Sequence, residues 1–251
     1  MTVTNDEDLR KLQAIGRIVA QTLEAMGAAI EPGMTTAELD DVGRRLLEAA
    51  GARSAPELVY DFPGATCISV NEQVAHGIPG SRVIAPGDLV NIDVSAEKDG
   101  FYADTGASFP VPPVSARIGR LCRDGRRALW TGIRQVRSDG PLVSIGDAVG
   151  AFARKNGYTL IRNLASHGIG RALHEEPTEI ATWPDRSERR RMTEGLVFTV
   201  EPFLSLGGAW AERADEDDPW TLVSEPRAPT VQYEHTIVVT RNGAVVVTLP
   251  Q

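Results

Sequence analysis

The tripeptide His-Gly-Ile occurs twice, at His76–Ile78 and His167–Ile169, in a chain of 251 residues that has only four histidines. After each copy comes a glycine, then a mostly apolar run, and then a carboxylate six positions on, at Asp93 and at Glu201. Because the pattern repeats, we expect two copies of a half-domain that direct acids and a histidine at a shared centre. Two-metal hydrolytic sites are built from such groups.

A second carboxylate closes each half beside an aromatic residue and a threonine, in Tyr102-Ala103-Asp104-Thr105 and Tyr233-Glu234-His235-Thr236. A single acid at a strand end is usually solvated or caps a helix, so the repetition carries the argument. Four carboxylates balance two divalent cations, and carboxylates with one imidazole suit Mn²⁺, Fe²⁺, Co²⁺ or Zn²⁺. Without cations, burying such acids in apolar strands would be costly. We therefore predict two divalent ions, held by Asp93, Asp104, His167, Glu201 and Glu234.

The other histidines are less clearly assigned. His76 shares its tripeptide with His167, which favours a functional role. His174 lies seven residues after His167 and, taken alone, fits a structural role as well as a functional one. His235 adjoins Glu234 on a predicted strand, so its side chain should point to the opposite face and is interpreted as structural. The sequence contains no GxSxG, HExxH or P-loop motif.

Helices and strands must position these groups. Apolar residues recur at helical spacing from Asp6 to about Met26, and Thr35-x-x-Glu38 is a capping box for a second helix that ends at Gly51. Strands are predicted at 66–71, 82–84 and 88–95. Asp99-Gly100 predicts a hairpin that sets the strands of Asp93 and Asp104 antiparallel.

The second half repeats this plan. A helix is predicted at 116–136 and another after Ser144-x-x-Asp147, with strands at 158–163, 195–202, 232–240 and 244–249. The segment 206–228 is predicted to be a loop, and its acidic stretch at 212–218 has no functional interpretation. We expect one α/β (α+β) catalytic domain over residues 1–251, with an internal repeat of roughly 6–112 and 113–249.

The overall composition is that of a globular protein, 42% hydrophobic and 24% charged. Its formal net charge of −8 disfavours non-specific binding to nucleic acid or anionic membranes. Cys67 and Cys122 form neither a CxxC pair nor a disulfide framework and indicate reduced thiols. No apolar leader and no membrane-spanning run are evident, so we expect a cytoplasmic protein. We also expect it to be a monomer.

Six motifs stand out along the chain: Thr66–Glu72 with Ala75–Pro79, Asn91–Val94, Asp104–Thr105, Ser166–Gly170, Thr199–Pro202 and Gln232–Thr236. They resemble those of the type I methionine aminopeptidases, in order and with matching spacing from about residue 8 to 248. The resemblance implies the pita-bread fold, a pseudo-twofold duplication of half-domains around a curved antiparallel sheet. The chain length matches the short bacterial form.

The same resemblance implies roles for individual residues. Asp93, Asp104 and Glu234 would bind or bridge the metals, with His167 and Glu201 completing the pair. Glu201 would also accept a proton from the water that bridges the metals. His76 would contact the substrate near the scissile amide, and His174 would stabilise the oxyanion of the scissile carbonyl. The substrate's free amino terminus would dock beside one metal.

The expected methionine pocket departs from the family pattern. Phe62, Cys67 and Trp220 stand at expected pocket positions. Val59 stands where the common bacterial form has a tyrosine, and Leu173 where it has a phenylalanine. We therefore expect a roomier, less aromatic pocket with altered tolerance for the first residue of the substrate.

The function implied is removal of N-terminal methionine from new proteins whose second residue is small, with a possible transient ribosome contact. A proline-specific aminopeptidase or dipeptidase of the same fold is one alternative. A non-catalytic relative that binds a protein partner is another. Such relatives lose metal ligands, whereas this chain keeps all five.

Overall fold

The computed structural model describes residues 1–250. Its helices are α1 (Asp6–Ala29), α2 (Thr36–Ala49), α3 (Ala55–Tyr60), α4 (Ala116–Ile133) and α5 (Val143–Asn156). The strands of the first half are β1 (Arg53–Ser54), β2 (Cys67–Val70), β3 (Gln73–Ala75), β4 (Leu89–Lys98) and β5 (Phe101–Pro110). Those of the second half are β6 (Thr159–Leu160), β7 (Ser166–Gly168), β8 (Glu175–Ile180), β9 (Val197–Val200), β10 (Phe203–Ser205), β11 (Trp210–Arg213), β12 (Leu222–Glu225), β13 (Thr230–Gln232), β14 (His235–Thr240) and β15 (Gly243–Val246).

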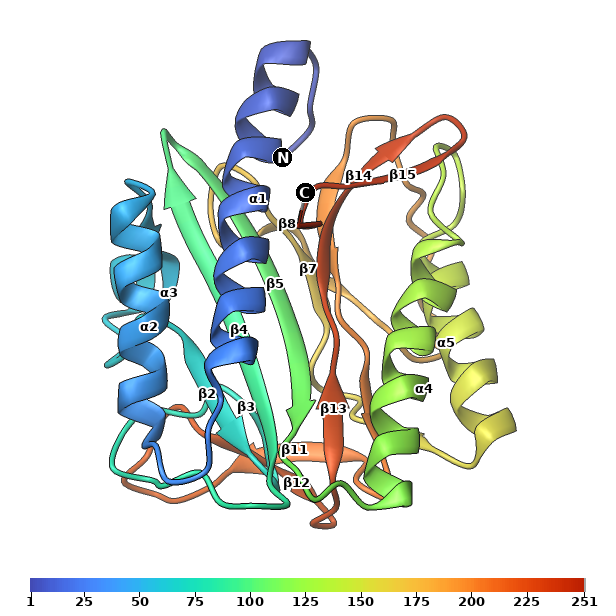
Figure 1. Ribbon diagram of the computed structural model, residues 1–251. Coiled ribbons are helices and arrows are strands. Elements are labelled where there is room, and N and C mark those ends of the chain that lie inside the picture. Colours follow the sequence, from blue (N-terminus) through green and yellow to red (C-terminus); the bar gives the residue numbers. More distant parts are fainter. Residues whose placement is uncertain (251) are drawn as a thin grey trace.

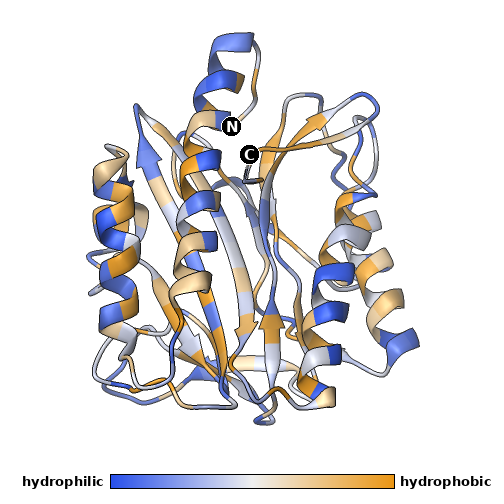
Figure 2. Ribbon diagram, viewed as in Figure 1, coloured by the Kyte–Doolittle hydropathy of each residue, from blue (hydrophilic) through white to orange (hydrophobic). Residues whose placement is uncertain are grey.

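The two long helices of each half lie beside one another, α1 with α2 and α4 with α5, on the near side of the strands in Figure 1. Their apolar residues face the strands and their polar residues face outward, as the colouring of Figure 2 shows. Every strand pair among residues 1–250 is antiparallel. Within the same residues no helix has the length and apolar character needed to span a membrane.

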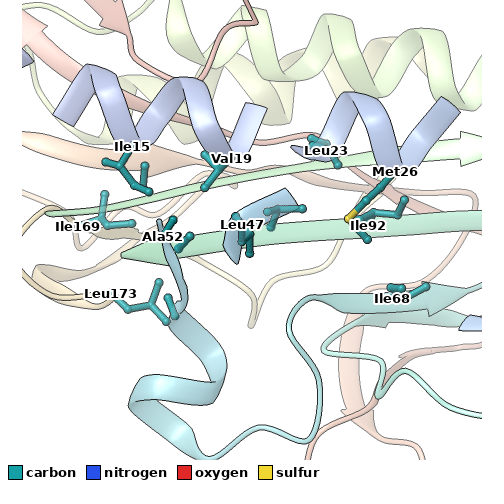
Figure 3. Packing of buried hydrophobic residues seen from close by; sticks show 14 of the residues in the cluster. Ile15, Val19, Leu23, Met26, Leu47, Ala52, Ile68, Ile92, Ile169 and Leu173 are labelled. Atoms are coloured by element: carbon teal, nitrogen blue, oxygen red, sulfur yellow. The ribbon is translucent and has the colours of Figure 1, made fainter. Parts of the chain in front are cut away.

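Helix α1 forms where the apolar spacing predicts it. The side chain of Asn5, one residue before the expected start, accepts a hydrogen bond from the backbone N–H of Asp8 and caps the helix. The capping box of Thr35 and Glu38 opens α2 as predicted. Ile15, Val19, Leu23 and Met26 face β4 and β5 in the core shown in Figure 3. Burying each such side chain contributes ~1.5–3 kcal/mol.

The hairpin between β4 and β5 is confirmed. Asp99 and Gly100 both have positive φ, as the tight turn requires, and the strands pair in register from Leu89↔Pro110 to Lys98↔Phe101. Gly106 on β5 is in close contact with the second half, because a Cβ there would lie 2.7 Å from the Oε1 atom of Gln232. The two halves therefore meet along β5.

Several expectations for individual helices and strands are wrong. Helix α5 begins after Leu142 with no side-chain cap, because the Ser144 hydroxyl donates to the carbonyl of Pro141 instead. The segment 206–228 is not simply a loop: β11 and β12 pair there, and β12 also pairs with β3. Residues 82–84 form only an isolated bridge at Val83, while α3, β3 and β8 were not predicted at all.

Candidate active site

The four predicted carboxylates lie at corresponding places in the two halves. Asp93 pairs with Gly106 and Asp104 with Ser95, so these two acids share one face of the β4–β5 hairpin. Glu201 directly follows β9 and Glu234 directly precedes β14. The register His235↔Val200 places Glu234 and Glu201 opposite one another. The duplicated sequence pattern thus becomes two facing pairs of acids.

His167 brings a nitrogen ligand to this group. One ligand atom from each of Asp104, His167 and Glu234 lies within 4.8 Å of the others. The Nε2 atom of His167 is 3.7 Å from Oε1 of Glu201 and 4.0 Å from Oδ2 of Asp104. Its Nδ1 atom lies 3.0 Å from the carbonyl of Gly168, so Nδ1 donates and Nε2 keeps its lone pair for the acids' centre. Burial, aided by the nearby His174, lowers the pKa of His167 to about 3, so its contacts with the acids are not ion pairs.

The buried acids fit divalent cations. Among residues 1–250, Oδ1 of Asp104 and Oε1 of Glu234 are buried and accept no hydrogen bond. Burial, together with the neighbouring carboxylates, raises the pKa of Asp104 and of Glu234 well above the ordinary range, and that of Glu201 to about 8. Cations between them would satisfy the free oxygens and let all the acids ionise.

The burial of these acids beside one another predicts a pH-dependent stability for the metal-free protein. The pKa of Glu201 is raised from 4.5 to about 8, so the folded chain holds a proton that the unfolded chain has released between those values. Stability must therefore fall as pH rises through that window. We expect the Tm of EDTA-treated protein to drop by at least about 5 °C between pH ~5 and pH ~8.5. Scanning calorimetry with and without added Mn²⁺ tests this, and an equal drop in the metal-loaded protein would contradict it.

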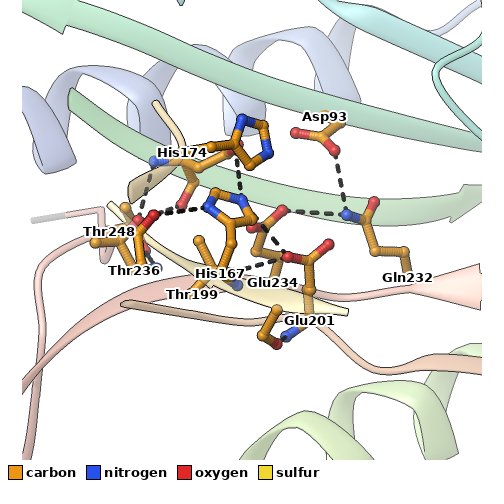
Figure 4. Close-up of polar contacts among 12 residues, drawn as sticks. Asp93, His167, His174, Thr199, Glu201, Gln232, Glu234, Thr236 and Thr248 are labelled. Carbon is orange, nitrogen blue, oxygen red and sulfur yellow. Dashed lines mark hydrogen bonds and ion pairs between the residues drawn. The ribbon is translucent and has the colours of Figure 1, made fainter. Parts of the chain in front are cut away.

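Polar residues that the sequence analysis did not single out support the acids. The Nε2 group of Gln232 donates to Oδ2 of Asp93 and to Oε2 of Glu234, both at 3.1 Å, and lies between them in Figure 4. The Thr199 hydroxyl donates to Oε1 of Glu201 at 2.8 Å and accepts from the backbone N–H of His167 at 3.1 Å. Gln232 and Thr199 each stand two residues before an acid. Because residues two apart on a strand share a face, this spacing could have identified both as partners of the acids.

The glycines of the twin tripeptides have a common explanation. A Cβ on Gly77 would lie 2.2 Å from the carbonyl oxygen of Ile68, and one on Gly168 would lie 2.5 Å from the carbonyl oxygen of Glu175. Both positions therefore need glycine for close backbone contact with a neighbouring strand. His76 itself has a φ of 53°, an unusual conformation for a residue with a side chain. Strained backbone conformations of this kind are typical of functional sites, and His76 lies at the edge of the group of acids.

A cavity of about 570 Å³ opens beside the acids. Asp93, Asp104, His167 and Glu201 line it, and Glu234 lies buried behind them. Phe62, Cys67 and Trp220 form part of its wall as expected, with the Phe62 and Trp220 rings edge to face at 5.4 Å. The side chains of His76 and His174 are exposed to it.

The expected position of Val59 is wrong. Val59 is 42% exposed and does not line the cavity; the next residue, Tyr60, does. Successive helical residues point about 100° apart, and in the short helix α3 this rotation takes Val59 outward. Because the Tyr60 and Trp220 rings lie 6.2 Å apart, the wall is aromatic at this point. Leu173 is buried and does line the cavity.

The two remaining histidines have different surroundings. Nδ1 of His174 lies 2.6 Å from the Tyr60 hydroxyl, and its ring is 4.0 Å from that of His167. Burial lowers the pKa of His174. His235 instead bonds Oγ1 of Thr248 through Nδ1 at 3.0 Å and contacts the Trp130 ring. It lies outside the cavity, in agreement with a structural role.

Comparison with known proteins places this geometry in a family. The model of metallopeptidase family M24 matches residues 10–241. The chain is 45% identical over 249 residues to methionine aminopeptidase 2 of Bacillus subtilis (strain 168), covering 99% of each. The crystal structure of methionine aminopeptidase from Rickettsia prowazekii is similar with a TM-score of 0.94 and 34% identity, covering 99% of this chain and 100% of that one.

A more distant likeness shows the fold alone. Prolidase from Pyrococcus furiosus is similar with a TM-score of 0.79 but 19% identity, and this chain covers 66% of it. The pita-bread fold expected from the motifs is confirmed, and neither the prolidase nor the non-catalytic alternative is favoured. Family membership also implies divalent metal binding. The chain belongs to metallopeptidase family M24 and, within it, to the methionine aminopeptidases.

Proposed function

We propose that this enzyme removes the N-terminal methionine of nascent proteins whose second residue is small, with two divalent ions held by Asp93, Asp104, His167, Glu201 and Glu234. The observation that carries the proposal is the buried acid group with unpaired oxygens at the wall of a partly aromatic cavity. Carboxylates with one imidazole suit Co²⁺, Mn²⁺, Fe²⁺ or Zn²⁺.

The cavity wall can hold the methionine side chain. Tyr60, Phe62 and Trp220 supply aromatic surface, and Cys67 and Leu173 add apolar contact. Methionine packs well against aromatic rings through its polarisable sulfur. Full burial of the side chain would contribute about 1.5–3 kcal/mol to binding. This energy would orient the first peptide bond toward the acids.

His76 and His174 are the proposed hydrogen-bond donors to the substrate. The walls of the cavity desolvate both rings and lower the pKa of each, which favours neutral imidazole rings. If the Tyr60 hydroxyl donates to Nδ1 of His174, then Nε2–H is the free donor for the scissile carbonyl. A donor fixed in this way would stabilise the developing oxyanion. His76 would contact the peptide beside the same bond.

Glu201 is the proposed general base. The bound ions, when present, would supply an activated water and polarise the scissile carbonyl. Glu201 would take the proton at a carboxylate oxygen and deliver it to the leaving amine. The hydrogen bond from Thr199 fixes this carboxylate in place. The cytoplasmic location, monomeric state, single-domain organisation and transient ribosome contact remain predictions.

A paired-substrate assay tests the function. Metal-reconstituted protein should cleave Met-Ala-Ser and leave Xaa-Pro peptides intact, and a bulky second residue should abolish cleavage. Preference for Xaa-Pro peptides would support a proline-specific enzyme. A protein that binds no divalent ion and cleaves neither peptide would support a binding role instead.

Tyr60→Phe should lower kcat by about threefold to tenfold, with KM changed less than about twofold, because one hydrogen bond that orients His174 is lost. Steady-state kinetics on Met-Ala-Ser measures this split. Val59→Ala is the matched control on the same helix and should leave both constants unchanged, since Val59 faces away from the cavity. A larger effect at Val59 than at Tyr60 would reverse the assignment.

A further inference from the structure

Charge is unevenly distributed in this acidic chain. Residues 116–156, which contain α4 and α5, have nine arginine or lysine side chains against three aspartates. The rest of the chain has 17 basic side chains against 31 acidic ones. The net charge of −8 therefore conceals a strongly basic helical pair on an acidic protein. Nothing in the proposed peptidase reaction uses this surface.

The basic side chains form a stripe along α4. Arg120, Arg123 and Arg127 of α4 and its C-cap residue Arg134 are spaced by three, four and seven residues, so they lie on one face of the helix. All four are exposed. From first to last they extend over roughly 21 Å, at about 1.5 Å per residue. We call these four residues the arginine face.

Two members of the arginine face are held in place. Arg120 and Arg127 both contact the buried carboxylate of Asp124, at 3.3 and 3.2 Å. Their guanidinium groups also lie over the rings of Tyr158 and Phe152, at 5.8 and 5.9 Å. Arg123 and Arg134 form no ion pair within residues 1–250. One carboxylate thus orients two guanidinium groups, and the stripe keeps a net positive charge.

We propose that the arginine face of α4 is a docking surface for the phosphate backbone of double-helical RNA. The guanidinium fork matches phosphate oxygens in pairs, and this stripe uses arginine throughout. Double-helical RNA is recognised through its shape and phosphates, which a straight row of cations can follow. The acidic remainder of the protein would repel RNA and so direct it to this face.

The surface does not resemble a site for an acidic protein. Protein interfaces usually have an apolar or aromatic centre, but none of the exposed large hydrophobic residues within 1–250 lies on α4. The surface is also separate from the cavity, because no residue of α4 lines it. RNA bound to α4 would therefore leave the cavity open to peptide. If the proposed function holds, the enzyme could act while attached to RNA.

Charge reversal on the arginine face gives a direct test. The probe is a fluorescein-labelled RNA duplex of about 20 base pairs, followed by anisotropy between about 50 and 200 mM salt. Arg123→Glu with Arg134→Glu should weaken binding at least about tenfold and reduce the salt slope by roughly 1.5–2. Arg10→Glu with Arg45→Glu, on exposed sites of α1 and α2, makes the same change in net charge. This control should change affinity less than about twofold.

Equal loss of binding in both double variants, or no binding by the unmodified protein, would overturn the proposal. Polyglutamate binding that depends on the arginine face and is as tight as RNA binding would also overturn it. Both variants should cleave Met-Ala-Ser normally, which shows that they fold; if the reversal impairs folding, Arg123→Gln with Arg134→Gln replaces it. Failure of peptide cleavage by the unmodified protein, with selective RNA binding retained, would count against the proposed function alone.

Discussion

Asp104→Asn is expected to lower kcat/KM by at least about 10³-fold, because the several kcal/mol that a bound metal contributes to the transition state would be lost with its ligand. The same substitution should raise the stability of the metal-free protein. Asp104 is buried, its Oδ1 atom has no hydrogen-bond donor, and burial with neighbouring acids raises its pKa. A neutral amide removes that repulsion. Kinetics on Met-Ala-Ser, metal content by mass spectrometry and Tm in EDTA measure the three effects.

Asp40→Asn is the matched control. Asp40 is equally buried, but its oxygens accept hydrogen bonds from the backbone N–H groups of Ala65 and Thr66 and from the Thr66 hydroxyl. Its substitution should lower Tm with or without metal and should leave metal content unchanged. An Asp104→Asn protein that is less stable than the parent in EDTA would contradict the charge argument. One that keeps both its metal and its activity would contradict the ligand assignment.

Repetition made the acids of the site predictable. The Gly-x5-acid pattern appears twice and specifies Asp93 and Glu201, and the Asp99-Gly100 turn sets the strand of Asp104 beside that of Asp93. These are short-range relations that sequence spacing records directly. Thr199 and Gln232, which hydrogen-bond these acids, could have been predicted in the same way, because each lies two residues before an acid on the same face of its strand. Their neutral side chains simply gave no chemical signal.

Other features depend on contacts between residues far apart in the sequence. The segment 206–228 has the composition of a loop, yet β12 pairs with β3 through Leu222 and Ala75 and closes the cavity side that carries Trp220. Helix α3 has only six residues, too few for periodicity to show which side chain faces inward. For this reason the expected pocket contained Val59 and did not include Tyr60, which lines the cavity. The net charge of the whole chain did not reveal the arginine face, because it sums the basic residues of α4 with the acidic residues elsewhere.

The twin tripeptides show how the duplication became asymmetric. Both glycines are required for close backbone contact, so the repeat preserves a packing constraint common to both halves. The histidines differ in their surroundings. His167 is buried among the acids, whereas His76 has positive φ and its side chain is exposed to the cavity. The shared scaffold therefore presents one imidazole to the acids and the other to the cavity.

Glu201→Gln should lower kcat by about 10²–10⁴-fold while KM changes less than about threefold, because the amide cannot accept the proton that a general base must take. The amide oxygen can still accept the hydrogen bond that the Thr199 hydroxyl gives to Oε1, so the side chain should keep its position. Metal content should therefore stay closer to that of the parent than in Asp104→Asn. Thr199→Val, which removes only the orienting hydrogen bond, should cost about 10–100-fold. If Glu201→Gln kept activity within tenfold of the parent with its metal intact, another group would have to be the base, and His174 would then be the first to test.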